Sequence, residues 1–125
     1  MSKIFKVKDA KKVTTPGVSD MYWLVNGDLG ATKFMVVEYE YAPNFSTQRV
    51  HYHERRESAY IVIRGEARIN LNGEEHTLRP GDVAYLSPKD IHGVVGSGPE
   101  GLKMIEIWAP QEKDVVYLED GKVVG

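Results

Sequence analysis

Apolar residues in this chain come in short alternating runs, separated by Gly, Pro and Asn, and no run keeps a helical period over a useful length. In residues 34–41, FMVVEYEY, the aromatic and aliphatic side chains at every second position predict a strand with one buried face. We expect Glu38 and Glu40, on the alternate positions, to face solvent. The other strands that the pattern predicts span residues 21–25, 48–53, 58–64, 66–71, 75–78, 83–87, 93–95 and 102–108.

Turn sequences connect these runs at hairpin spacing. Asn72-Gly73 is the dipeptide of a two-residue hairpin turn. Residues 96–101, GSGPEG, are expected to connect two separate strands. Nine or ten short strands in 125 residues predict an all-β sandwich or barrel of the jelly-roll kind. We expect one domain over residues 1–125, with an extension or edge strand at 1–20 and a tail at 109–125.

The composition of the chain limits which binding partners and which kinds of chemistry are expected. With 16 basic and 18 acidic side chains the net charge is −2, and no basic run stands out, so neither nucleic acid nor a membrane is an expected partner. The absence of cysteine excludes disulfides, thiolate metal sites and a cysteine nucleophile. The basic N-terminus lacks the apolar stretch of a signal peptide, and we expect a cytoplasmic protein.

Three of the four histidines are placed so that they can share one metal ion. His51 and His53 are two residues apart, so an extended strand turns both to the same face, and a neighbouring strand can bring His92 to the same point. Converging neutral imidazoles suit Zn, Fe, Mn, Ni or Cu without distinguishing among them. We predict one divalent ion per chain, about 2.0 to 2.2 Å from each nitrogen. His76, in a polar hairpin, is expected on the surface.

The residues around these histidines resemble the two motifs of the cupin superfamily, usually written G(X)5HXH(X)3-4E(X)6G and G(X)5PXG(X)2H(X)3N. The segment HYHERRESAYIVIRG supplies the His-X-His and the closing Gly65, and GDVAYLSPKDIH places His92 eleven residues after Gly81. The resemblance implies a small single-domain cupin with a double-stranded β-helix fold. It also implies that residues 44–108 hold both motifs and the metal site, and that the protein forms a homodimer.

The fourth ligand is ambiguous. Cupins usually carry a metal-binding Glu in the first motif, and counting back from Gly65 places Ser58 at that position. Counting forward from His53 with the shorter spacing places Glu57 there instead. Adjacent residues on a strand face opposite ways. Because Gly65 should fix the register, we expect Ser58 to face the metal, with Glu57 kept as a possible fourth ligand.

Three further residues are candidates for the pocket. By alternation Tyr60 faces inward, where it could donate to a bound oxygen or serve as a core side chain. Arg49, the inward neighbour of His51, could bind an anionic substrate or lie at the rim. Glu106 would be a general acid or base if it faced inward. We expect it to face outward, with the isoleucines on either side facing in, because a solvated or paired glutamate is the default.

An open three-histidine site predicts an enzyme acting on a small polar metabolite, such as a sugar acid, keto acid or sugar phosphate, by isomerase, lyase or dioxygenase chemistry. The alternative is a cupin that binds a metal or ligand without turnover, as a sensor or storage module. The segment 102–108 is apolar on both faces, and Phe34 and Val36 add outer apolar surface. This excess predicts a homodimer.

Overall fold

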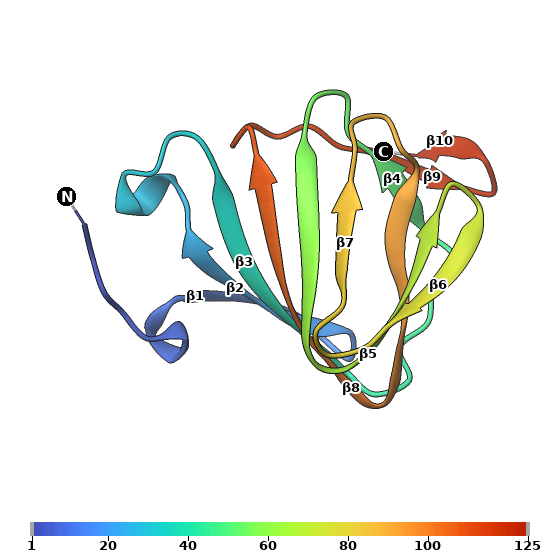
Figure 1. The fold of residues 1–125 in the computed structure, drawn as a ribbon, viewed down its shortest axis with the longest axis horizontal. Helices are drawn as coiled ribbons and strands as arrows, with labels where there is room; N and C mark the ends of the chain where they lie inside the picture. Colours follow the sequence, from blue (N-terminus) through green and yellow to red (C-terminus); the bar gives the residue numbers. More distant parts are fainter. Residues whose placement is uncertain (1, 125) are drawn as a thin grey trace.

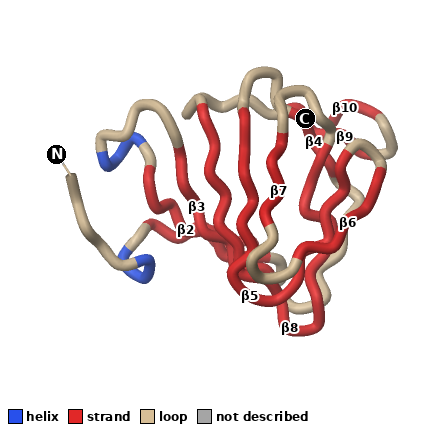
Figure 2. The backbone as a smooth tube through the Cα atoms, viewed as in Figure 1, coloured by secondary structure: helices blue, strands red, loops and turns tan. Residues whose placement is uncertain are grey.

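The computed structural model describes residues 2–124, and antiparallel strands make up most of it (Figure 1, Figure 2). The expectation of an all-β jelly-roll barrel is confirmed. Two short 3-10 turns occur at Val7–Asp9 and Gly27–Leu29. None of the helical segments within residues 2–124 has the length and hydropathy needed to cross a membrane. The strands are β1 (Lys11–Thr15), β2 (Ser19–Val25), β3 (Met35–Tyr41), β4 (Val50–Tyr52), β5 (Glu57–Leu71), β6 (Glu74–Leu78), β7 (Val83–Leu86), β8 (His92–Ala109), β9 (Val116–Glu119) and β10 (Lys122–Val124).

Two long strands, β5 and β8, join the halves of the barrel. They pair antiparallel from Glu57 opposite Ala109 to Leu71 opposite His92. The first part of β8 also pairs with β4, and its second part pairs with β3. Each long strand therefore belongs to both walls of the barrel, and the space between the walls holds the core and the cavity.

A close approach of two glycines forms the corner where both long strands bend. Gly65 and Gly101 have φ values of +79° and +81°, which L side chains rarely adopt. A Cβ on Gly65 would overlap the carbonyl oxygen of Gly101. The prediction that residues 96–101 connect two separate strands was wrong. The glycines let β5 and β8 bend, with shifts in register, while pairing resumes on either side.

The alternation predicted for β3 holds on one face and fails on the other. Met35 and Val37 are buried in the core, as expected. Glu38 was expected in solvent, but it is only 5% exposed and its carboxylate lies 3.6 Å from the Lys103 ammonium. Because β3 lies between β2 and β8, cross-strand neighbours flank this side chain and cover it.

The chain ends also add strands to the barrel. Within the segment 109–125, expected as a tail, residues 116–124 form the β9–β10 hairpin, and β9 pairs with β4, placing Tyr117 opposite His51. At the other end, β1 is an exposed edge strand beside β2. The C-terminal segment thus forms one wall of the region around the histidines.

The corner can be tested by comparing two glycines that share a positive φ but differ in their surroundings. We expect Gly65→Ala to lower the free energy of unfolding by at least about 3 kcal/mol, because the added methyl displaces backbone. Gly73→Ala, at φ +88° with open space around it, should cost only about 1 to 2 kcal/mol. Denaturant unfolding measures both, and equal losses would contradict the close approach.

Candidate metal centre

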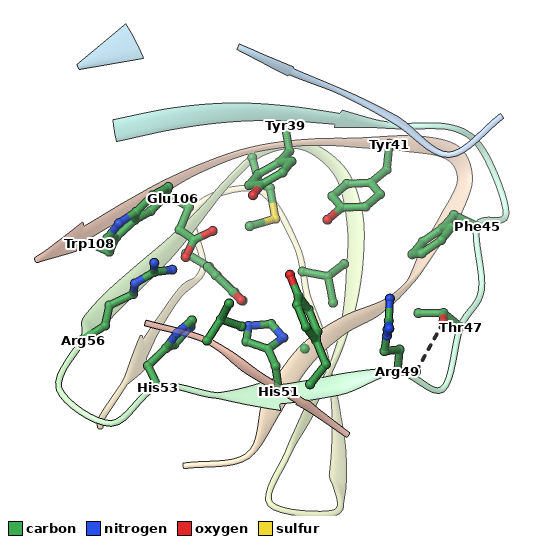
Figure 3. A pocket seen from close by; sticks show the side chains of 16 residues that line it. Tyr39, Tyr41, Phe45, Thr47, Arg49, His51, His53, Arg56, Glu106 and Trp108 are labelled. Carbon is green, nitrogen blue, oxygen red and sulfur yellow. Dashed lines mark hydrogen bonds between the residues drawn. The ribbon is translucent and has the colours of Figure 1, made fainter. Parts of the chain in front are cut away.

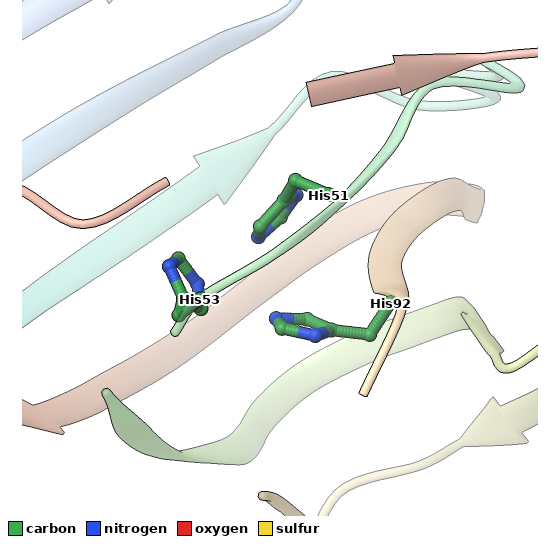
Figure 4. Close-up of side chains that lie close together, drawn as sticks. All are labelled: His51, His53 and His92. Carbon is green, nitrogen blue, oxygen red and sulfur yellow. The ribbon is translucent and has the colours of Figure 1, made fainter. Parts of the chain in front are cut away.

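The structure brings three histidines together from two neighbouring strands. His51 lies in β4, His53 directly follows that strand, and His92 begins β8 opposite His51. The ring centroids lie 4.4 Å apart for His51 and His92, 4.9 Å for His51 and His53, and 5.2 Å for His53 and His92. One nitrogen from each ring lies within 4.8 Å of the others. Figure 4 shows the rings turned toward one another.

Backbone carbonyls fix the orientation of two of these rings. The Nδ1–H of His53 donates to the carbonyl oxygen of Asp114, and the Nδ1–H of His92 donates to that of Asp90 at 2.9 Å. Since a carbonyl can only accept, each proton is on Nδ1 and each Nε2 carries a lone pair. Both Nε2 atoms are buried, and within residues 2–124 neither has a hydrogen-bond partner. Two lone pairs are thereby presented to the space that the three rings share.

The rings are also held in the neutral form that a metal requires. Burial, together with the smaller effects of His92 and His53, lowers the pKa of His51 to about 3. Burial lowers the pKa of His53 to about 4, against the opposing effect of its bond to Asp114. Burial likewise lowers the pKa of His92. All three imidazoles are uncharged at neutral pH, so their nitrogens are available as ligands.

The donor set fits a divalent transition metal. Three nitrogens that share one ion at 2.0 to 2.1 Å lie about 3.4 Å apart, so small ring rotations would close the observed group around an ion. Imidazole suits Zn, Fe, Ni and Cu, and nothing in the donor set selects among them or excludes Mn. The fit rests on the two partnerless Nε2 atoms together with the neutral state of all three rings.

Asp114 holds the turn that follows His53. Its carboxylate accepts from the backbone N–H groups of Glu54 at 2.9 Å, Arg55 at 2.8 Å and Arg56 at 3.1 Å. Burial opposes ionisation, but these three donors outweigh it and lower the pKa of Asp114. Sequence analysis missed this residue, because it lies far along the chain from His53 and contacts backbone, which leaves no pattern.

The ambiguous pair in the first motif lies as the count from Gly65 predicts. Ser58 is buried on the inner face of β5. Glu57 is exposed on the outer face, where its carboxylate accepts from the Tyr85 hydroxyl at 2.7 Å. The described part of the chain contributes three histidines and no carboxylate to the group of close donors.

Next to the histidines lies a cavity of about 380 Å³, and Glu106 lines it (Figure 3). The expectation that Glu106 faces outward was wrong, since the residue is only 6% exposed. The apolar pattern of 102–108 could not distinguish the two faces. The pairing decides it, because Glu106 lies opposite Val37 on one side and Tyr60 on the other, both buried. Burial raises the pKa of Glu106 to about 7, against the lowering effect of the Arg56 charge.

The other candidates from the sequence take different positions. Tyr60 is buried and lines the cavity, and burial raises the pKa of its hydroxyl well above the ordinary value. Arg49 lines the same cavity from an exposed position, with its guanidinium 4.7 Å from the centre of the Tyr117 ring. His76 is exposed on β6, as expected. Of these three residues, only Tyr60 is buried.

Arg56 is a cavity residue that sequence analysis missed. Its guanidinium carbon lies 4.5 Å from the centre of the Trp108 ring, at the end of the cavity near Glu106 (Figure 3). The sequence did contain an indication of this position. Arg56, Ser58 and Tyr60 are each two residues apart, so the alternation that turns Ser58 and Tyr60 inward also turns Arg56 inward. The cavity therefore has a cation at each end, Arg49 and Arg56.

The lowered histidine pKa values predict how stability depends on pH. Folded His51 and His53 titrate near 3 and 4, whereas the unfolded chain titrates near 6.5 and so binds more protons between about pH 6.5 and pH 4. Stability is fully present above this window and falls as the pH drops through it. We expect metal-free protein to lose up to about 2 kcal/mol per histidine between pH 7 and pH 5, measured by denaturant unfolding. His51→Gln should lose correspondingly less, and an equal loss would contradict the neutral buried ring.

Several solved structures share this fold. The polyketide cyclase RemF from Streptomyces resistomycificus is 28% identical with a TM-score of 0.76, over 97% of this chain and 89% of RemF. An uncharacterized conserved protein with a double-stranded β-helix domain from Klebsiella pneumoniae is 26% identical, with a TM-score of 0.75, over 96% and 100% of the two chains. KdgF from Halomonas sp., at 21% identity, TM-score 0.75 and 90% and 97% coverage, shows likeness of fold alone.

The sequence itself also matches a family model. No curated protein matches the chain. Residues 37–108, more than half of the sequence, match the model of the cupin domain, and this stretch includes the three histidines, Glu106, all of β5 and all but the last residue of β8. By this match and by its barrel, the chain belongs to the cupin family.

Proposed function

We propose that this cupin binds one divalent metal ion through His51, His53 and His92. We also propose that it is an enzyme whose reaction removes a proton from, or adds one to, a small oxygen-containing substrate. The observation that carries the proposal is the pair of buried Nε2 atoms, on His53 and His92, that lack partners among the described residues. Leaving such atoms unpaired is costly, and a metal ion satisfies both.

The chain's own residues divide the chemical work. A bound divalent ion would polarise a carbonyl or carboxylate oxygen of the substrate. Glu106, with a pKa raised to about 7, populates both protonation states near neutral pH and can take up and return a proton. The hydroxyls of Tyr39 and Tyr60 stay protonated, because burial raises the pKa of each, and they can donate to substrate oxygens.

This division favours isomerase or lyase chemistry within the range expected from the sequence. Proton transfer beside a polarised carbonyl needs an acid-base group in the cavity, which Glu106 supplies, whereas dioxygenase chemistry makes no such demand. Sugar acids, keto acids and sugar phosphates all carry suitable oxygens. RemF is named as a cyclase, so an enzyme occurs on this fold at 28% identity. That supports an enzyme over a sensor or storage module.

We also propose that the protein forms a homodimer. Apolar side chains are exposed together on the outer face of adjacent strands β5, β7 and β8: Ile63 is 46%, Val83 61%, Tyr85 60% and Ile107 36% exposed. A second copy would cover this surface.

Sedimentation equilibrium should give twice the chain mass of 14.1 kDa, and Val83→Lys should shift the protein toward the monomer. A wild-type monomer at micromolar concentration would contradict the proposal.

Metal content tests the ligand set. We expect His53→Ala to abolish stoichiometric metal with little loss of fold, because apolar strands rather than the ion form the core. Glu57→Gln is the matched control, since its carboxylate lies outside the barrel, and Ser58→Ala should keep metal affinity within about tenfold, ~1.4 kcal/mol. Elemental analysis with a zinc titration measures all three. Full metal content in His53→Ala, or loss of metal in Glu57→Gln, would overturn the assignment.

Hydrogen exchange at carbon tests the role of Glu106. Metal-loaded protein incubated in D₂O with a panel of keto acids, pyruvate and 2-oxoglutarate among them, should catalyse deuterium incorporation next to the carbonyl, followed by NMR. Glu106→Gln should lower the rate by about 100-fold or more, within the usual range for general acid-base catalysis, without changing metal content. An unchanged rate in Glu106→Gln would exclude Glu106 as the base. Metal binding without exchange on any substrate would favour the binding module.

A further inference from the structure

The cavity beside the histidines carries an excess of positive charge. Its lining includes the guanidinium groups of Arg49 and Arg56 and a single carboxylate, that of Glu106. Arg56 is half-buried, whereas Arg49 is exposed. Across residues 2–124, no carboxylate lies at ion-pair distance from Arg56. Its neighbour Arg55, outside the cavity, donates from Nε to Glu112 at 2.6 Å.

The guanidinium of Arg56 is held in place without an ion pair among residues 2–124. It stacks 4.5 Å from the centre of the Trp108 ring, and its Nη2 donates to the Glu112 carbonyl oxygen at 3.4 Å. The backbone N–H of the same residue donates to the Asp114 carboxylate at 3.1 Å. The orientation is therefore set before any ligand arrives.

One buried donor of this guanidinium has no acceptor in the described chain. The Nε–H of Arg56 is buried and unpaired within residues 2–124, as is the Nε1–H of Trp108. Buried donors are almost always paired in folded proteins, so an unpaired donor on a side chain that lines the cavity calls for an acceptor from outside the chain. The edge of an arginine presents two parallel N–H groups, and a planar carboxylate matches them.

We propose that Arg56 binds a carboxylate of the substrate, so that the substrate is a carboxylic acid anchored at the Arg56–Trp108 end of the cavity, with its reacting oxygen directed at the three histidines. Only the placement of the reacting oxygen at the histidines rests on the proposed function; the binding of the carboxylate by Arg56 does not. A single negative charge suits the lining, because the second cation, Arg49, lies at the opposite end of the cavity (Figure 3). A phosphate dianion would lack a second cation beside Arg56.

Benzoate and benzamide are suitable probes, because they share a shape and differ in charge. The chain has two tryptophans, and the indole Nε1–H resonance of Trp108 in ¹⁵N-labelled protein reports on the proposed site. The Trp23 ring packs edge-to-face on Trp108, with centroids 6.4 Å apart, so its signal serves as a second reporter. Titrations are run on the protein as isolated and after metal removal, so that binding through a metal is separated from binding through Arg56. Arg55→Gln is the matched control for Arg56→Gln.

We expect benzoate to shift the Trp108 signal saturably with or without metal, and benzamide to bind at least tenfold more weakly. Arg56→Gln should weaken benzoate binding at least tenfold, Arg56→Lys should weaken it several-fold, and Arg55→Gln should leave it within twofold. The inference would be overturned if benzoate did not bind, if benzamide bound equally well, or if inorganic phosphate bound more tightly than benzoate. It would also be overturned if benzoate binding were unchanged in Arg56→Gln or Arg56→Lys. Benzoate binding in metal-free His53→Ala upholds it even if the metal proposal fails.

Discussion

The continuous pairing of β5 with β8 is the constraint on which the rest of this molecule depends. Both strands bend at the contact between Gly65 and Gly101 and continue into the opposite wall of the barrel. Because β8 serves both walls, its first residue, His92, lies opposite His51, while Glu106, further along the same strand, lines the cavity beside Tyr60. A single bent strand therefore supplies both a proposed metal ligand and the proposed acid-base group, and their separation is set by backbone pairing.

Backbone groups orient the histidines of the candidate metal centre. The carbonyl oxygens of Asp90 and Asp114 hold the rings of His92 and His53, and burial keeps the rings neutral. Asp114 is used twice, since its carboxylate also holds the turn that leads from His53 to Arg56. The C-terminal segment thus orders a candidate ligand, His53, and a cavity cation, Arg56, together, which explains why a stretch without a motif belongs to the site.

Sequence could predict those features that depend on local alternation. The spacing of His51 and His53, and the count from Gly65 that turns Ser58 inward, follow from the period of a strand. The orientation of Glu106 could not be predicted, because apolar residues occupy both faces of its strand and only cross-strand pairing decides between them. The contacts of Asp114 were hidden for another reason, since a side chain that accepts from distant backbone imposes no pattern on its partners.

The central claim is that the barrel presents preformed imidazole lone pairs to one point, and the tautomers of the histidines test it most directly. Long-range ¹H–¹⁵N correlation spectra of metal-free protein at pH 7 distinguish a protonated from an unprotonated ring nitrogen. The account predicts that His53 and His92 are neutral and carry their protons on Nδ1, with Nε2 unprotonated. Protonated Nε2 atoms, or charged rings at this pH, would contradict it.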